Sequence, residues 1–473
     1  MSGSSTIAAT AGGVPTNYRC PPGVLLGMCI GVSTYWLFAL SMGPLLPSIG
    51  NELNLKVPDL ALPMSLAGLV SGICIMPAGG LADRVGRLLM TRLGLLAGLL
   101  GMLMCGLASS IEWLIAGRFL QGLAAGFIMP ATLALVKVYY NDDDRPKAIS
   151  YWSMSSFGCA SVSSIFGGLV ATFIGWRWAF LLAVPFILIA FWLLRGAPES
   201  KVASDRKLPF DGIGFTVLIT GLLALFLFVN KGNNWGWAST ETLTALFVFV
   251  VMLVAFIAQE RRHAAPIADL SLFKRKVFTG AVVANLFLNS LLGLLVVLLA
   301  YLQKGRGLTA LEASLLTLSY TVTVLTLIRV GEKMGKRQGP RFPMVVGGLC
   351  FMACAALLSC TFVADNPTYF GLVFVGMGFM GTGLGLFATP ATNAAVGEAP
   401  ADKAGAAGGI FKMASSLGGA FGIAIHMAVY GSIQLANGGN LHEAAQYALG
   451  MGVIAALLGA LFSYWLAPSL KKA

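Results

Sequence analysis

The chain has 473 residues, of which 57% are hydrophobic and only 11% are charged. Soluble proteins carry about 25% charged residues, so this composition excludes a water-soluble globule. The formal net charge of +12 would suit a nucleic-acid-binding protein, but the positions of the basic residues point instead to membrane topology.

Apolar segments long enough to cross a bilayer fill most of the sequence. A helix needs about 20 apolar residues to cross a hydrocarbon core of about 30 Å, and a helix satisfies its own backbone polar groups there. We therefore predict an all-α polytopic membrane protein with fourteen transmembrane helices. The predicted spans are residues 23–48, 60–80, 88–109, 112–138, 146–172, 177–196, 211–230, 239–258, 277–303, 309–332, 341–363, 367–394, 404–434 and 442–467.

The basic residues gather on one side of these spans. If the N-terminus is cytoplasmic, the Lys and Arg residues on the outer side are Lys56, Arg177, Lys231, Lys304 and Arg306, and most others lie inside. Cytoplasmic loops are enriched in Lys and Arg, so we expect both termini to be cytoplasmic. Residues 1–22 contain no apolar run, and we expect no cleavable signal peptide.

A charged turn occurs twice. Residues 79–87, which follow the second span, contain Asp83, Arg84, Gly86 and Arg87, and a shorter copy at residues 331–336 contains Glu332 and Lys333. Two further segment pairs match at an offset of 260, namely 129–136 with 389–396 and 155–158 with 415–418. These matches pair span 2 with span 10, span 4 with span 12 and span 5 with span 13.

This constant shift of eight spans predicts two related halves. We expect six-helix bundles at 23–196 and 277–467, separated by linkers and an inserted helix pair at 197–276, with short cytoplasmic tails at 1–22 and 468–473. Chains built from such repeats usually move a solute through the seam between the halves.

Several motifs resemble those of a known family. The charged turn, Arg118-x-x-Gln121-Gly122 in span 4 and Gly167-Gly168 in span 5 resemble signatures of the major facilitator superfamily. The span count resembles its fourteen-helix drug:proton antiporter branch. Within that branch, residues 35–39, 129–132, 150–153, 175–178 and 412–415 resemble bacterial quinolone exporters of the NorB/NorC type.

The resemblance implies a proton-coupled exporter of hydrophobic drugs in the bacterial cytoplasmic membrane. Its partners would be small drugs, protons and lipid, with no cofactor, nucleic acid or obligate protein partner. The sequence departs from the family at two points. Ser163-Ser164 replace a Gly-Pro pair before Gly167, and Phe38 stands where many relatives have an aspartate.

The charged turns are predicted to form a conformational latch on the inner face. Asp83, Arg84, Gly86 and Arg87 would act with Glu332 and Lys333, because an acid can pair with arginines or with the positive N-terminus of the next helix. The alternative is a tight loop that only sets topology.

Two residues of span 4 are candidates for proton coupling. Arg118 lies about 9 Å into the span at ~1.5 Å per residue, where a charge is expensive, and Gln121 accompanies it. The alternatives are an arginine that reaches the outer surface or that bonds carbonyl groups of a neighbouring helix.

A central cavity is predicted from aromatic and basic residues within the spans, because drug pockets are mostly apolar with few polar groups. The candidates are Tyr35, Trp36, Phe38, Trp152, Lys412 and His426. Lys412 would be a substrate counter-ion or a structural partner, and His426 a ligand or a hydrogen-bonded packing residue. Gly167 and Gly168 would seal the outer face.

No acid is expected in the middle of a span, so the hypothesis favours zwitterionic or anionic aromatic substrates. The competing interpretation is a carrier for one organic anion or metabolite, working by exchange or import. A receptor or scaffold would need a soluble domain, which the sequence lacks. The eight cysteines have no metal-ligand spacing, and we find no nucleophile or nucleotide-binding motif that would indicate an enzyme.

Overall fold

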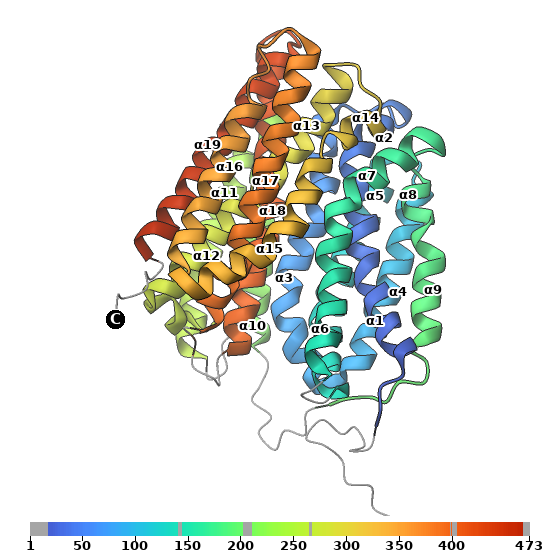
Figure 1. Ribbon diagram of the computed structural model, residues 1–473. Helices are drawn as coiled ribbons and strands as arrows, with labels where there is room; N and C mark the ends of the chain where they lie inside the picture. Colours follow the sequence, from blue (N-terminus) through green and yellow to red (C-terminus); the bar gives the residue numbers. More distant parts are fainter. Residues whose placement is uncertain are drawn as a thin grey trace, which may run out of the picture.

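Every element of the described chain is a helix, and the longest of these helices run the height of the molecule (Figure 1). The computed structural model describes residues 18–140, 144–201, 211–263, 267–397, 399 and 404–466. Residues 1–17 of the predicted N-terminal tail and the whole predicted C-terminal tail, 468–473, lie outside these ranges. The all-helical fold expected from composition is confirmed.

The first group of helices, which we call the N-half, runs from α1 to α9. Its elements are α1 (Pro22–Ser33), the π-helix η1 (Thr34–Ala39), the 3₁₀ helix η2 (Leu40–Leu45), α2 (Leu46–Glu52), η3 (Val57–Leu60), α3 (Ala61–Val85), α4 (Arg87–Gly106), α5 (Ile111–Tyr139), α6 (Arg145–Ser153), the π-helix η4 (Met154–Gly158), α7 (Cys159–Phe173), α8 (Trp178–Leu181) and α9 (Ala183–Leu193).

The rest of the chain forms an inserted pair and a second group, the C-half. The inserted pair is α10 (Gly212–Trp235) and α11 (Thr240–Arg262). The C-half comprises η5 (Leu270–Lys274), α12 (Lys276–Asn289), α13 (Leu292–Lys304), α14 (Ala310–Leu315), α15 (Leu318–Gln338), α16 (Arg341–Leu358), α17 (Asn366–Gly397), α18 (Ala404–Ala436) and α19 (Leu441–Leu466).

These helices account for the fourteen predicted spans. Within the described residues, thirteen helical segments are long and apolar enough to cross a membrane. The remaining predicted span, 177–196, corresponds to α8 and α9, which form a shorter apolar segment at Trp178–Leu193. The first span is interrupted, because α1 passes into a π-helix and then into a 3₁₀ helix that contains Pro44. Such irregular turns are frequent at functional positions.

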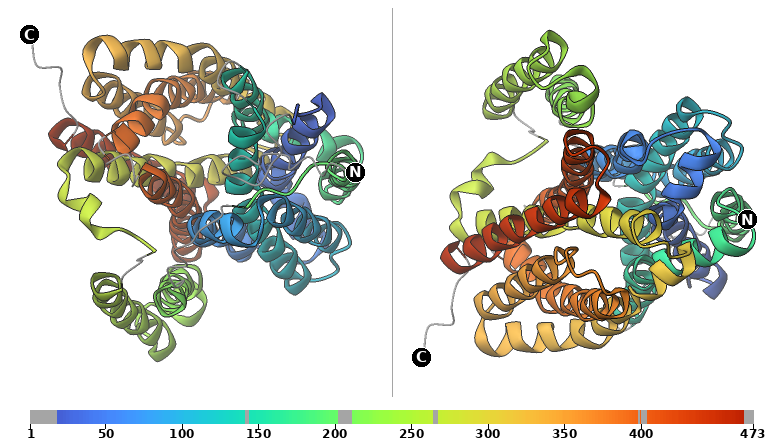
Figure 2. Two further views of the ribbon diagram at one scale, coloured as in Figure 1. Left: turned by 90° about the horizontal axis from the view of Figure 1, so that it is seen from below. Right: turned by 90° about the horizontal axis from the view of Figure 1, so that it is seen from above.

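The chain enters the first helix and leaves the last one at the same end of the molecule (Figure 1). We call this end, where α3 passes into α4, the terminal face. The other end, where α14 lies, is the opposite face. When the molecule is viewed along this axis, the two halves lie side by side and the inserted pair stands to one side of them (Figure 2).

The two halves meet along α3 and α18. A Cβ atom on Gly72 of α3 would lie 3.0 Å from Ser416 Cβ of α18, so glycine lets the two helices approach closely. The inserted pair joins this contact from the side, with Phe226 of α10 in an apolar cluster with Leu69 and Ala420. Asn233 Nδ2 also donates to the Ala428 carbonyl at 2.7 Å.

Three hydrogen bonds between the halves lie toward the opposite face. Gln303 Nε2 donates to the Pro44 carbonyl at 3.1 Å, the Leu311 N–H to Thr172 Oγ1 at 3.1 Å, and Thr321 Oγ1 to the Ser161 carbonyl at 2.6 Å. These contacts join α7 and the broken first span to α13, α14 and α15. The halves are therefore closed against each other at the opposite face.

Candidate functional site

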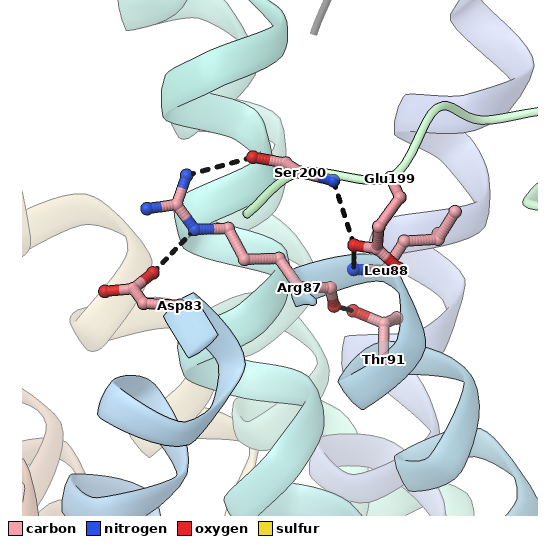
Figure 3. Close-up of polar contacts among 6 residues, drawn as sticks. All are labelled: Asp83, Arg87, Leu88, Thr91, Glu199 and Ser200. Carbon is pink, nitrogen blue, oxygen red and sulfur yellow. Dashed lines mark hydrogen bonds and ion pairs between the residues drawn. The ribbon is translucent and has the colours of Figure 1, made fainter. Parts of the chain in front are cut away.

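The charged turn between α3 and α4 is held by an ion pair within the N-half (Figure 3). Arg87 Nε lies 2.7 Å from Asp83 Oδ1, one helical turn away. The Arg87 Nη1 group also donates to Ser200 Oγ at 3.2 Å. Arg84 is exposed on the last turn of α3. Asp83 thus pairs with the nearby arginine, one of the two partners expected from the sequence.

The other expected partner, the N-terminus of the next helix, is taken by a residue that sequence reasoning missed. Glu199, in the segment after α9, accepts hydrogen bonds from the backbone N–H groups of Leu88 and Leu89 at the start of α4, both at 2.9 Å. The N–H of Arg87 donates to the Ser200 carbonyl at 3.0 Å. A carboxylate at this position compensates the positive end of the α4 dipole.

Gly86 makes this contact possible. Its φ is +131°, in the range that favours glycine. A Cβ atom here would lie 2.6 Å from the Glu199 carboxyl carbon. The turn therefore needs glycine both for its backbone conformation and for the approach of the carboxylate.

The second copy of the turn has a simpler geometry. Lys336 Nζ lies 2.5 Å from Glu332 Oε1, an i,i+4 pair near the end of α15. The predicted Lys333 lies on the same helix turn. A cavity of about 320 Å³ adjoins Glu332 and Lys336 and is bounded by Pro390 of α17.

Arg118 is fully buried, with 1% of its surface exposed, and all its described acceptors are neutral. Its guanidinium donates to the Pro63 carbonyl at 2.9 Å, to Ala39 at 2.7 Å and to Met64 at 3.2 Å. These carbonyl groups belong to α3 and to the last residue of the π-helix η1. Arg118 thus ties α5 to the break in the first span, the carbonyl-bonding arrangement that the sequence left open.

Gln121 completes this arrangement. Its Oε1 accepts from Arg118 Nη1 at 2.7 Å, and its Nε2 donates to Met102 Sδ at 3.2 Å. The adjacent Gly122 lies against α3, because a Cβ atom there would be 2.7 Å from the Ala67 carbonyl oxygen. The motif on α5 therefore packs α3, α4 and the first span around one buried cation.

The predicted aromatic residues occupy different environments. The rings of Tyr35 and Trp36 are in edge contact at 5.5 Å, and the buried Trp36 Nε1 has no hydrogen-bond partner. Phe38 is 3% exposed and contacts Phe166 and Phe186 within the N-half. Trp152 donates from Nε1 to Thr132 Oγ1 at 2.9 Å. Sequence alone gave no means of separating these environments.

The C-half candidates lie on α18. His426 is 2% exposed, its Nδ1 donates to the Gly422 carbonyl at 2.8 Å, and its Nε2 has no partner. Lys412 is half-buried near the terminal face. Asn285 of α12, which the sequence did not single out, donates to the Phe411 carbonyl at 2.9 Å and to Ser415 Oγ at 2.6 Å. This anchors the segment of α18 that carries Lys412.

Gly167 and Gly168 lie in the contact at the opposite face. A Cβ atom on Gly167 would be 2.8 Å from Pro44 Cγ of the first span. A Cβ atom on Gly168 would press against Ser314 Oγ and lie 2.6 Å from the Ala310 carbonyl oxygen of α14. Both glycines thus sit where the closed face allows no side chain.

Comparison with known proteins decides the family. Residues 27–423 match the Major Facilitator Superfamily. The chain belongs to that superfamily. It is therefore a multi-pass membrane transporter and not an enzyme. It is 40% identical over 435 residues to the quinolone resistance protein NorB of Staphylococcus aureus strain MRSA252, covering 91% of this chain and 93% of NorB. NorB of strain MSSA476 gives the same values.

Solved transporters share the fold at low sequence identity. A bacterial homologue of the human lysosomal transporter Spinster, in an inward-facing, unoccupied conformation, has a TM-score of 0.64 at 16% identity and covers 94% of this chain and 98% of its own. A POT family transporter in complex with 5-aminolevulinic acid has a TM-score of 0.69 at 17% identity, with coverages of 93% and 95%. At these identities the likeness concerns the fold.

Proposed function

We propose that this transporter exports hydrophobic aromatic drugs, quinolones among them, in exchange for protons. The observation that carries the proposal is 40% identity to NorB along nearly the whole of both chains. The proposed mechanism is alternating access, in which the six-helix bundles at 23–196 and 277–467 rock around a midplane cleft. The terminal face is proposed to be cytoplasmic, as the basic loops favour.

In this mechanism, the glycine contact at Gly167 and Gly168 is the outer seal. The charged turns form the inner latch when the halves close at the terminal face. In the described conformation Asp83 and Arg87 pair with each other, and Arg87 also bonds Ser200 of the segment that follows α9. Closure of the terminal face would bring Asp83, Arg84, Gly86 and Arg87 toward the C-half and its Glu332 and Lys333.

Arg118 and Gln121 are proposed to link proton movement to the first span. Arg118 holds the Ala39 carbonyl at the point where the π-helix ends. A change in the protonation state of groups in the cleft would alter the electric field at the Arg118 guanidinium. This field is strong because it acts through a medium of low dielectric constant. Release of the Ala39 carbonyl would let the first span bend.

The proposed cleft favours substrates with an anionic group. The charged residues buried in the described chain are Arg118, Asp211 and Glu260, and the two acids lie at the ends of α10 and α11. The residues proposed to line the cleft are therefore basic or aromatic: Tyr35, Trp36, Phe38, Trp152, Lys412 and His426. The unpartnered Trp36 Nε1 is a free donor, and His426 Nε2 a free acceptor when the ring is neutral.

The same basic character of the proposed cleft supports the second candidate function, a carrier for one organic anion.

Transport by the purified protein in liposomes with an imposed pH gradient distinguishes the drug exporter from the anion carrier. Norfloxacin movement that depends on the gradient and stops when a protonophore is added supports the exporter. Transport of ethidium alone would contradict the preference for anionic groups. If neither drug moves, drug export is rejected and organic anions become the substrates to test.

A matched pair of variants links the result to the site. Lys412→Met should lower norfloxacin transport, whereas Lys274→Met, which changes an exposed lysine at the end of η5, should not. Equal transport by both variants would exclude Lys412 as a counter-ion.

A further inference from the structure

Two buried acids lie at the base of the inserted helix pair, the end at which α10 begins and α11 ends. Asp211 is the residue before α10 and is 3% exposed, and Glu260 is in the last turn of α11 and is 5% exposed. Ionised carboxylates are rarely buried unless they are paired. The immediate surroundings of these two side chains show how their charge is compensated.

One oxygen of each acid has its partners. Asp211 Oδ1 accepts from the Gly214 N–H at 2.8 Å and from Gln259 Nε2 at 3.0 Å. Glu260 Oε2 accepts from the Ala268 N–H at 2.9 Å. Together the two acids therefore fasten the start of α10, the end of α11 and the segment that leads to the C-half.

The other oxygen of each acid has no hydrogen-bond partner. These are Asp211 Oδ2 and Glu260 Oε1, and both are buried. They face the same place, because a Cβ atom on Gly214 would lie 2.5 Å from the first and 3.0 Å from the second. The titratable group that faces them in the described chain is His263, whose Nδ1 is 3.9 Å from Asp211 Oδ2.

Two like charges that face the same point in a buried site are strongly unfavourable when both groups are ionised. A hydrogen bond between the two unpartnered oxygens would remove both the repulsion and the unsatisfied acceptors, and it requires one proton. A bound metal ion fits less well, since no group of three potential ligands is found among the described residues.

We propose that Asp211 and Glu260 hold one proton between them, in a site that fastens the base of the inserted helix pair. The proton comes from water and bridges Oδ2 and Oε1, leaving one negative charge on the pair, which His263 faces. Its loss at high pH would separate α10 from α11 at this end. The site does not depend on the substrate or direction of transport.

Infrared spectroscopy of the full-length protein in liposomes tests this directly. The carbonyl-stretch band of a protonated carboxyl group should lose the intensity of one group per chain in Glu260→Gln. Asp211→Asn should lose the same band, since the new amide can donate to Glu260 and the carboxylate no longer needs the proton. The double variant should lose no more than either single one.

Glu241→Gln is the matched control, because Glu241 is an exposed acid at the other end of α11. An unchanged band in both single variants would overturn the proposal, as would separate losses that add in the double variant. Folding of each variant is checked by circular dichroism and gel filtration. If one single variant fails to fold, the other carries the test.

A bound cation is distinguished by thermal unfolding in sodium chloride and in choline chloride at equal ionic strength. The contrary result is that sodium stabilises the wild type but not Glu260→Gln. That result would show that a cation and not a proton occupies the site, and it would overturn the proposal. Equal unfolding in the two salts supports it.

Discussion

Glu199 Oε1 lies 2.9 Å from the backbone nitrogen of Leu88, although 111 positions separate the two residues in sequence. The contact brings the segment after α9 onto the first turn of α4, directly beside the Asp83–Arg87 pair (Figure 3). The charged turn is thus supported by the segment that leaves the N-half after α9.

Replacing Glu199 with Gln should weaken this support while preserving size. The amide oxygen still accepts a hydrogen bond, but the charge that compensates the α4 dipole is lost. The expected cost is about 1 kcal/mol, the usual scale for caps and helix-dipole charges. Thermal unfolding in detergent measures it. Glu241→Gln, at the exposed start of α11, is the control, and an equal loss in both variants would refute a special role for Glu199.

Gly86→Ala should be far more damaging than Gly80→Ala, although both glycines belong to the same turn. The new methyl group at position 86 would meet the Glu199 carboxylate and an unfavourable φ, whereas nothing lies within 4 Å of the Cβ position at Gly80. We expect reduced abundance and transport for Gly86→Ala and near wild-type behaviour for Gly80→Ala. The double variant Gly86→Ala/Glu199→Ala should recover in part, since it removes the clash but not the backbone strain.

The Asp83→Asn variant should show whether Asp83 acts in the latch or only supports the fold. The Asp83 side chain is 43% exposed, and exposed ion pairs contribute about 0–1 kcal/mol to stability, so abundance should stay near that of the wild type. Drug transport in liposomes should nevertheless fall. Asp144→Asn, in a longer exposed pair with Lys147, is the control. Normal transport by Asp83→Asn at wild-type abundance would reject the latch.

Much of this architecture could be predicted from the sequence, because membrane helices and charged turns depend on local composition. Asp83, Arg87, Arg118 and Gln121 stand out as polar groups in apolar surroundings. Glu199 did not stand out, because its contact with the start of α4 depends on how the linker after α9 folds back. The span count was predicted as well, with α8 and α9 forming a shorter segment than the others.

The directions of the side chains in the first span could not be predicted from the sequence. The π-helix η1 turns more slowly than an α-helix, which shifts the face presented by each later residue. Trp36 keeps an unpartnered Nε1, whereas Phe38 packs against Phe166 and Phe186. The acceptors of Arg118 were equally hidden, because a backbone carbonyl such as that of Ala39 has no signature in the sequence.

Arg118→Lys should destabilise the protein even though the charge is kept. A lysine has a single nitrogen and cannot reach Pro63, Ala39, Met64 and Gln121 together, and each buried acceptor left without a donor costs about 1–3 kcal/mol. We expect a lower unfolding temperature and reduced abundance, measured by fluorescence-detected gel filtration. Arg261→Lys, at the exposed end of α11, should have no effect. Wild-type stability of Arg118→Lys would show that the carbonyl contacts are dispensable.

Gly168→Ala should shift the transporter toward a conformation that is open at the opposite face. The added methyl group would press against Ser314 and the Ala310 carbonyl, and overpacking of this kind costs about 1–3 kcal/mol. Because the strain exists only when α7 and α14 are in contact, it should change the population ratio roughly 5-fold or more. Spin labels near the ends of these helices report that distance. Gly158→Ala, with nothing within 4 Å of its Cβ position, should leave the distance distribution unchanged, and the same result for Gly168→Ala would contradict its assignment as a seal.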